Sequence, residues 1–134
     1  MFIPPILADT NIFVAAGFNR GSSSHQIISA LHQGRLLQIW NEKTRQETLA
    51  IVERIPPLDP DFVEILFRDE GYFPGPTAPE DFEIIEDKSD RKFAALAHAC
   101  GVLLITNDSD FLNIRDLLDI TVLRPSEFVA IRSF

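Results

Sequence analysis

Short apolar runs that end in polar clusters recur along the chain, and longer stretches with helical periodicity separate them. Runs with so little alternation are typical of strands buried on both faces. They predict strands at 3–8, 36–40, 82–85, 102–105 and 120–123. The periodic stretches predict helices at about 24–33, 42–55, 60–69, 91–100 and 111–118, with a terminal helical turn at 125–129. Strands that alternate with helices predict an α/β fold with a mostly parallel sheet covered on both faces.

Segments rich in glycine, proline and serine mark the connections. Residues 15–24 predict a loop, with Ser23 or Ser24 as the cap of the next helix. Residues 71–81 contain two glycines and three prolines and predict an irregular surface excursion. Asp59-Pro60 is a typical cap with proline in the first helical turn. The residues of the helix after it that should face the core are Phe62, Ile65 and Leu66.

Composition narrows the class of protein. The chain has 134 residues, 46% of them hydrophobic, which predicts a single domain over 1–134 with a full core. The net charge of −8 argues against a protein that coats nucleic acid through a basic surface. The single cysteine, Cys100, excludes an intramolecular disulfide framework. No apolar run has the length of a membrane span, and the start of the chain lacks a signal-peptide pattern, so we expect a cytoplasmic protein.

Two acidic residues follow strands from opposite ends of the chain. Asp9 comes directly after the first strand, and Asp108 follows the apolar run 102–105 in the sequence Thr-Asn-Asp-Ser-Asp. Ligands of α/β proteins bind at the carboxyl edge of the sheet, so the two carboxylates should meet there. Carboxylates brought together repel each other unless a cation neutralises them or one keeps its proton. Oxygen-rich sites of this kind suit Mg²⁺ or Mn²⁺.

Other polar residues are candidates for the same site. Asp110 is separated from Asp108 by one residue and could approach the same cation, or support a ligand. Asp90 precedes the helix 91–100, where an acid also serves as an ordinary helix-capping or dipole-favoured residue. Glu47 joins the site only if its helix packs over the same edge. Asn11 could orient Asp9 or cap a helix.

Other chemistries have little support in the sequence. The three histidines, His25, His32 and His98, share no metal-ligand spacing. Cys100 falls on an apolar helical face, which favours a buried hydrophobe over a nucleophile. The glycine-rich phosphate-binding motifs of dinucleotide and nucleotide enzymes are absent from the sequence.

These motifs together resemble the PIN-domain ribonuclease family over nearly the whole chain. Asp9-Thr10-Asn11 resembles the first motif of the family, and Asn41 followed six residues later by Glu47 resembles the second. The stretch 90–97 resembles the third, and 104–112, Leu-Ile-Thr-Asn-Asp-Ser-Asp-Phe-Leu, the fourth. Two features depart from the family pattern. Asn41 stands where a small hydroxyl residue is usual, and the excursion at 71–81 has no counterpart.

The resemblance implies a three-layer α/β/α sandwich that cleaves RNA phosphodiester bonds with Mg²⁺ or Mn²⁺. It makes Asp9, Glu47, Asp90 and Asp108 the catalytic acids, with Asp9, Asp90, Asp108 and Asp110 as the metal-binding set. RNA contacts are expected from Asn11, Arg20, Lys43 and Arg45. Many members are toxins of the VapC type, so the expected partners are RNA, an antitoxin protein and a second copy in a homodimer.

Two alternatives remain open. One is a catalytically silent PIN-like module that binds RNA or protein without cleaving. The other is a metal-dependent phosphatase or a receiver-like domain, which also gathers acids at strand ends. A receiver needs an aspartate after a middle strand and a lysine after a late one. Here the corresponding strands end in Trp40-Asn41 and Arg124-Pro125, which disfavours it.

Overall fold

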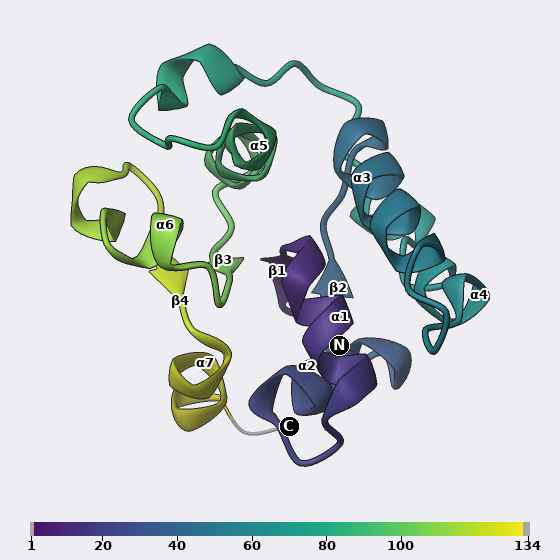
Figure 1. Cartoon of the computed structure of the whole chain (residues 1–134). Helices are drawn as coiled ribbons and strands as arrows, with labels where there is room; N and C mark the ends of the chain where they lie inside the picture. Colours follow the sequence, from purple (N-terminus) through teal and green to yellow (C-terminus); the bar gives the residue numbers. More distant parts are fainter. Residues whose placement is uncertain (1, 133–134) are drawn as a thin grey trace.

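Four short parallel strands form the centre of the molecule. The computed structural model describes residues 2–132. Strands β1 (Pro5–Ala8), β2 (Leu37–Gln38), β3 (Leu104–Ile105) and β4 (Val122–Leu123) lie in the order β2-β1-β3-β4 (Figure 1). All their pairings are parallel, and Ala8 lies opposite Ile105. The predicted α/β class with a parallel sheet is therefore confirmed.

Alternation along the strands divides the core into two clusters, one on each face of the sheet. Ile6, Ala8 and Ile105 belong to the first cluster, and Leu7 and Leu104 to the second. Neighbouring strand residues point to opposite faces, so β1, β3 and β4 each contribute to both clusters. This division explains why β1, β3 and β4 are apolar throughout instead of alternating with polar residues.

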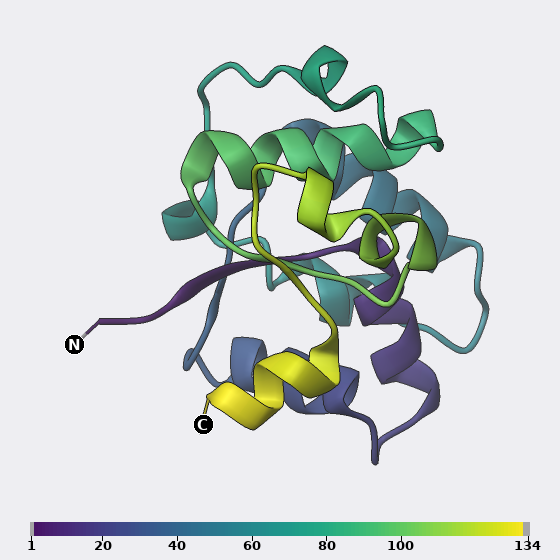
Figure 2. The same cartoon turned by 90° about the vertical axis from the view of Figure 1, so that its left-hand side faces the viewer.

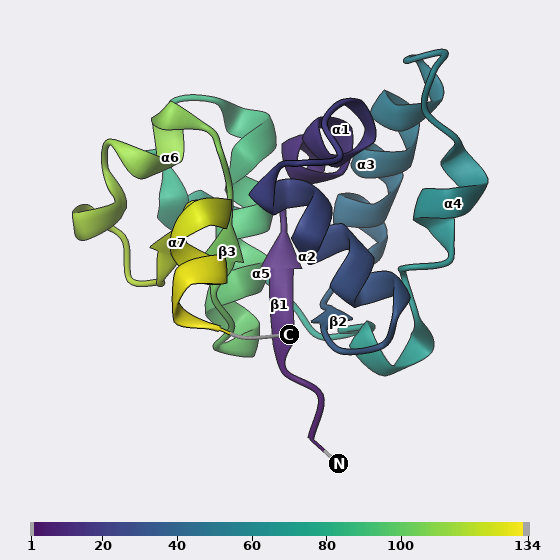
Figure 3. The ribbon, with the colours of Figure 1, turned by 90° about the horizontal axis from the view of Figure 1, so that it is seen from below.

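Helices cover both clusters and complete three layers. Helices α1 (Thr10–Phe18), α2 (Ser23–His32) and α7 (Pro125–Ile131) lie on one face, as Figure 3 shows from their side. Helix α5 (Arg91–Cys100) covers the other face together with α6 (Ser109–Leu112) (Figure 2). Helices α3 (Glu42–Glu53) and α4 (Pro60–Glu64) flank the β2 edge (Figure 1). Among the described residues, no helix combines the length and apolar character needed to cross a membrane.

Side-chain caps mark the first residues of helices α2, α3 and α4. Asn41 accepts a hydrogen bond from the Thr44 backbone N–H at 3.0 Å, and its own N–H donates to the Thr44 hydroxyl at 3.1 Å. Asparagine therefore caps α3 fully in place of a hydroxyl residue. The cap of α2 is Ser22, which accepts from the His25 N–H at 3.1 Å, so the predicted cap at 23 or 24 was wrong by a residue or two. The helical N-cap of α4 is Asp59, as predicted.

The predicted loop at 15–24 is wrong, because α1 runs through Phe18 and leaves only a four-residue connection, 19–22, before α2. Gly17, which lies within α1, serves helix packing and does not form a turn. A Cβ atom added to Gly17 would lie 2.2 Å from the Leu58 Cδ2 atom. The glycine therefore allows the helix and the segment before α4 to approach closely, which local sequence does not reveal.

Three other predicted elements differ from the structure. Residues 82–85 form no strand: Phe82 ends the 3₁₀ turn η2 (Pro79–Phe82), and it packs with Ile85 under α5. The helix predicted at 60–69 stops at Glu64. Phe62 and Ile65 are 51% and 60% exposed, and only Leu66 of the predicted inward residues is buried. The helix predicted at 111–118 divides into α6 and the 3₁₀ turn η4 (Arg115–Leu117).

The excursion at 71–81 begins by covering the exposed edge of β2. The Trp40 N–H donates to the Gly71 carbonyl at 2.9 Å, and the Phe73 N–H donates to the Trp40 carbonyl at 2.8 Å. Gly71, the last residue of the 3₁₀ turn η1 (Asp69–Gly71), lies against the Gln38 carbonyl, where a Cβ atom would have no room. The segment therefore protects a strand edge that would otherwise offer unpaired backbone groups.

Candidate functional site

The carboxyl ends of β1 and β3 open into an acidic pocket of about 210 Å³. Residues that follow β1, residues of α1 and α3, the segment that leads into α5, the start of α5 itself and the segment after β3 converge on it. The residues that line it are Asp9, Thr10, Asn11, Glu47, Ile51, Asp87, Ser89, Asp90, Phe93 and Asp108. Asp9, Asp90 and Asp108, which are far apart in the sequence, thus share one pocket, and Glu47 and Asn11 share it with them.

Asp9 is the most deeply placed of these acids, with 5% of its surface exposed. The Thr106 hydroxyl donates to its Oδ2 atom, whereas its Oδ1 atom is buried and has no hydrogen-bond partner. Burial is the main cause that raises the pKa of Asp9 to about 7, and the bond from Thr106 acts in the opposite direction. In the absence of a cation, this carboxyl therefore tends to keep its proton near neutral pH.

Buried hydrogen bonds hold the backbone on both sides of Asp9. The Gln38 side-chain amide accepts from the Ala8 N–H at 3.1 Å and donates to the Ala8 carbonyl at 2.9 Å. Strand β2 ends at Gln38, and the side chain takes the place of a further strand residue. On the other side, the Thr10 and Thr48 hydroxyls are hydrogen-bonded at 2.8 Å. Asp9 is therefore set in a rigid frame.

Thr106 links Asp9 to Asp108. Its hydroxyl donates to Asp9 and accepts from the Asp108 backbone N–H at 2.9 Å. The register of β1 against β3 places Thr106 opposite Asp9, because Ala8 is paired with Ile105. The Asp9 N–H confirms this register by donating to the Ile105 carbonyl at 3.1 Å. One hydroxyl therefore couples the ends of two neighbouring strands.

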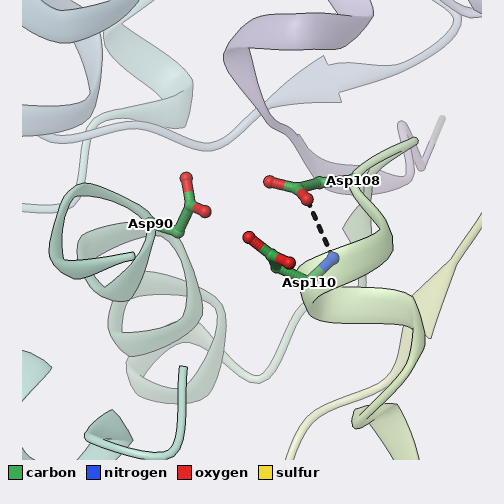
Figure 4. Close-up of side chains that lie close together, drawn as sticks. All are labelled: Asp90, Asp108 and Asp110. Atoms are coloured by element: carbon green, nitrogen blue, oxygen red, sulfur yellow. Dashed lines mark hydrogen bonds between the residues drawn. The ribbon is translucent and has the colours of Figure 1, made fainter. Parts of the chain in front are cut away.

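A second group of acids lies between α5 and α6. One carboxylate oxygen from each of Asp90, Asp108 and Asp110 lies within 4.8 Å of the other two. Figure 4 shows Asp90 at the start of α5 facing Asp108 and Asp110 across the gap. The Asp108 carboxylate also accepts from the Asp110 backbone N–H at 2.9 Å. Asp9 lies outside this set of three.

Asp90 has the environment of an uncompensated acid. Its Oδ2 atom is buried without a hydrogen-bond partner. Its pKa is raised to about 7, first by burial and then by the negative charges of Asp108, Asp87 and Asp9. The neighbouring acid Asp87 is already engaged, since its carboxylate accepts from the Ser89 N–H at 2.9 Å and from the Ser89 hydroxyl at 2.8 Å. Asp87 therefore acts as the cap of η3 (Lys88–Asp90).

The arrangement fits a hard divalent cation. The donors are carboxylate oxygens, which Mg²⁺ and Mn²⁺ prefer. Two of these oxygens, Asp9 Oδ1 and Asp90 Oδ2, are buried without a partner, which is costly unless a proton or a cation satisfies them. The three aspartates Asp90, Asp108 and Asp110 thus form a possible metal site.

Glu47 lines the pocket from α3 but already has a cationic partner. The Lys92 ammonium donates to its Oε1 atom from α5. Both side chains are mostly covered, with 20% of Glu47 and 24% of Lys92 exposed. Glu47 differs in this respect from Asp9 and Asp90, each of which has one buried carboxylate oxygen without a partner.

The proposed RNA-contacting residues are spread over the surface. Asn11 is exposed at the pocket, and Lys43 is exposed one helical turn before Glu47. Arg20 lines a different hollow, between α1, α2 and α4. Arg45 pairs with Glu64 at 3.0 Å, and its guanidinium lies 6.0 Å from the centre of the Trp40 ring, so it is used in holding α4 to α3. Neither arginine lines the acidic pocket.

Sequence reasoning missed three residues that shape the site: Gln38, Lys92 and Thr106. Thr106 directly precedes the acidic cluster, and a prediction of the β1–β3 register would have placed it opposite Asp9. Gln38 was a detectable exception, as the polar residue within an apolar strand. Lys92 gives no local signal, because its partner is 45 residues away in the sequence.

Comparisons of the chain with protein-family models, curated proteins and solved structures yield no match. The chain itself shows an α/β fold with a four-stranded parallel sheet and an acidic cluster at its carboxyl edge.

Proposed function

We propose that this chain is a PIN-like endoribonuclease that depends on Mg²⁺ or Mn²⁺. The observation that carries the proposal is one pocket, at the carboxyl edge of a parallel sheet, that gathers Asp9, Asp90 and Asp108 and leaves two buried carboxylate oxygens without partners. Such a set has a strong need for positive charge. The motif resemblance supports RNA as the substrate.

Some residues of the pocket would bind the cation, and others would hold the binding residues in position. Asp90 and Asp108, with Asp110 beside them, would bind the ion, and Asp9 would face it directly or through water. A bound divalent ion supplies Lewis acidity, which activates water and offsets charge on the scissile phosphate. Thr106 holds Asp9 and Asp108 in fixed relative positions. Asn11 and Lys43, exposed near the pocket, would contact the RNA strand. Arg20 and Arg45 do not line the pocket and would contact only an RNA long enough to extend beyond it.

The proposal extends to the biological role. The resemblance to PIN-domain toxins of the VapC type supports a toxin that acts in the cytoplasm and is held inactive by an antitoxin. A homodimer is part of the same proposal. Growth arrest on expression of the wild-type chain, absent for Asp90→Asn, would support the toxin role. Normal growth at equal expression would count against it.

Cleavage of a single-stranded RNA tests the enzymatic proposal. We expect turnover with Mn²⁺, none with EDTA, and a loss of at least about a hundredfold for Asp90→Asn or Asp108→Asn, because each removes a ligand of the ion. The matched control is Asp69→Asn, which makes the same change at an exposed aspartate of η1. Activity that survives EDTA and Asp90→Asn would mean that the acids are structural. RNA binding without turnover would instead indicate the silent module.

A further inference from the structure

A phosphodiester substrate poses an electrostatic problem for this site. Five acidic residues line the pocket, and the chain as a whole carries a net charge of −8. Metal ions offset part of this charge, but an anionic strand also needs a protein cation close to the pocket. The question is which basic side chain the fold brings there.

Most arginines near the site are committed elsewhere. Arg91, although it directly follows Asp90, donates to the Ile85 carbonyl at 2.8 Å and the Glu83 carbonyl at 3.2 Å, so its guanidinium is turned back onto its own chain. Arg45 is held by Glu64, as described above. Both positive charges are thus used to fix local structure.

Lys92 is placed differently. It lies in the first turn of α5, and its ammonium reaches across to α3 and contacts Glu47, a residue of the pocket wall. It also influences a second lining acid: the pKa of Asp87 is lowered mainly by its bonds from Ser89 and in smaller part by the charges of Lys92 and Arg91. The ammonium therefore contacts one acid of the pocket wall and acts electrostatically on a second.

The contact with Glu47 leaves donors available. A lysine ammonium carries three N–H groups, and Glu47 Oε1 accepts one of them. A phosphate oxygen at the pocket could accept another without breaking the ion pair. Glu47, for its part, has its charge neutralised by Lys92, so it has less need of a metal ion than Asp9 or Asp90.

We infer that Lys92 is a phosphate-binding residue of this site and that Glu47 is the positioning residue that holds its ammonium at the pocket, instead of a ligand of the metal. The inference rests on the proposed ribonuclease function. It gives the RNA backbone a defined protein contact at the junction of α3 and α5, and it separates Glu47 from the aspartates in role.

Two variants of Lys92 and a matched control test the phosphate contact. Lys92→Gln should raise KM for single-stranded RNA about tenfold or more, the usual effect of losing a hydrogen bond to a charged group. It should also reduce the salt dependence of kcat/KM by a slope of about one, as expected for one lost phosphate contact. Lys92→Arg should restore both. The control Arg35→Gln removes the same charge just before β2, at the opposite edge of the sheet from the pocket.

Loss of Lys92 also leaves the Glu47 charge unpaired, which could disturb the fold. The double variant Lys92→Gln/Glu47→Gln avoids this, because two amides can keep a neutral hydrogen bond. It should fold like the wild type by circular dichroism and show the same rise in KM. A double variant with wild-type KM and salt slope would overturn the inference.

Binding of Mn²⁺ in the absence of RNA, measured by isothermal titration calorimetry, tests the role of Glu47 without any turnover. Glu47→Gln should bind Mn²⁺ within about twofold of the wild type, whereas Asp90→Asn should lose about tenfold or more. An equal loss for Glu47→Gln would make Glu47 a metal ligand and overturn its positioning role.

The two levels of proposal fail in different ways. If the wild type neither cleaves nor binds RNA, the ribonuclease proposal falls and the Lys92 inference falls with it. If the wild type cleaves RNA and Lys92→Gln behaves like Arg35→Gln, only the Lys92 inference is wrong.

Discussion

Burial of Asp9 should make the metal-free protein lose stability as pH rises. Its pKa is about 7 in the folded protein against an ordinary value of 3.8. A carboxyl whose pKa is raised on folding favours the folded state when protonated. Its stabilising effect is therefore complete below about pH 4 and is lost as pH rises through about 7.

The difference between the two pKa values sets the magnitude. Roughly three pH units at 1.36 kcal/mol each correspond to about 4 kcal/mol of unfolding free energy lost between acidic and mildly alkaline solution. Over this range the slope is about −1.4 kcal/mol per pH unit from Asp9 alone. Asp90, whose pKa is raised in the same direction, should add to the slope, but by less because it is more exposed to solvent.

Asp9→Asn removes the ionisable group and isolates this effect. The new amide can still accept from Thr106, but its N–H groups would occupy the buried place of Oδ1, where no partner is present, at a cost of about 1–3 kcal/mol. We therefore expect the variant to be less stable than the wild type near pH 4 and more stable by about 1–3 kcal/mol near pH 8.

Urea unfolding in EDTA across pH 4 to 9, followed by circular dichroism, measures the stability of the wild type and of the variant. Addition of Mg²⁺ near pH 8 should stabilise the wild type more than Asp9→Asn, because the ion offsets the charge that the variant lacks. Parallel pH profiles for the two chains, or a wild type that becomes more stable as pH rises, would refute the reasoning.

Three further predictions concern the frame of the site. Gln38→Leu leaves the Ala8 N–H and carbonyl buried without partners and should cost about 2–4 kcal/mol in urea unfolding; an unchanged midpoint would mean that water replaces the amide. Thr106→Val should lower the cleavage rate about tenfold or more, whereas Thr106→Ser should change it little, because the hydroxyl alone donates to Asp9. Equal rates for the two variants would show that this hydroxyl does not support the site. Asn41→Ala should destabilise the fold by about 1 kcal/mol while Asn41→Ser keeps the cap, as thermal unfolding can show.

The sequence by itself determined the class of fold and the position of the main acids. Mostly apolar runs are typical of strands covered on both sides, and their alternation with helices favours a parallel sheet. Asp9 and Asp108 then had to fall at one edge, because parallel strands end on the same side. The cap of α4 was equally local.

The tertiary structure decided what depends on contacts between distant segments. Gly17 and Phe62 show this in opposite directions: a glycine that suggested a loop lies within α1 against Leu58, and a phenylalanine expected in the core remains half exposed. The depth of Asp9 and the pairing of Glu47 with Lys92 arise from the β1–β3 register and from the approach of α3 to α5. Local pattern fixes which side chains are near a strand end, but only packing fixes their burial and their partners, and these set the charge state of the site.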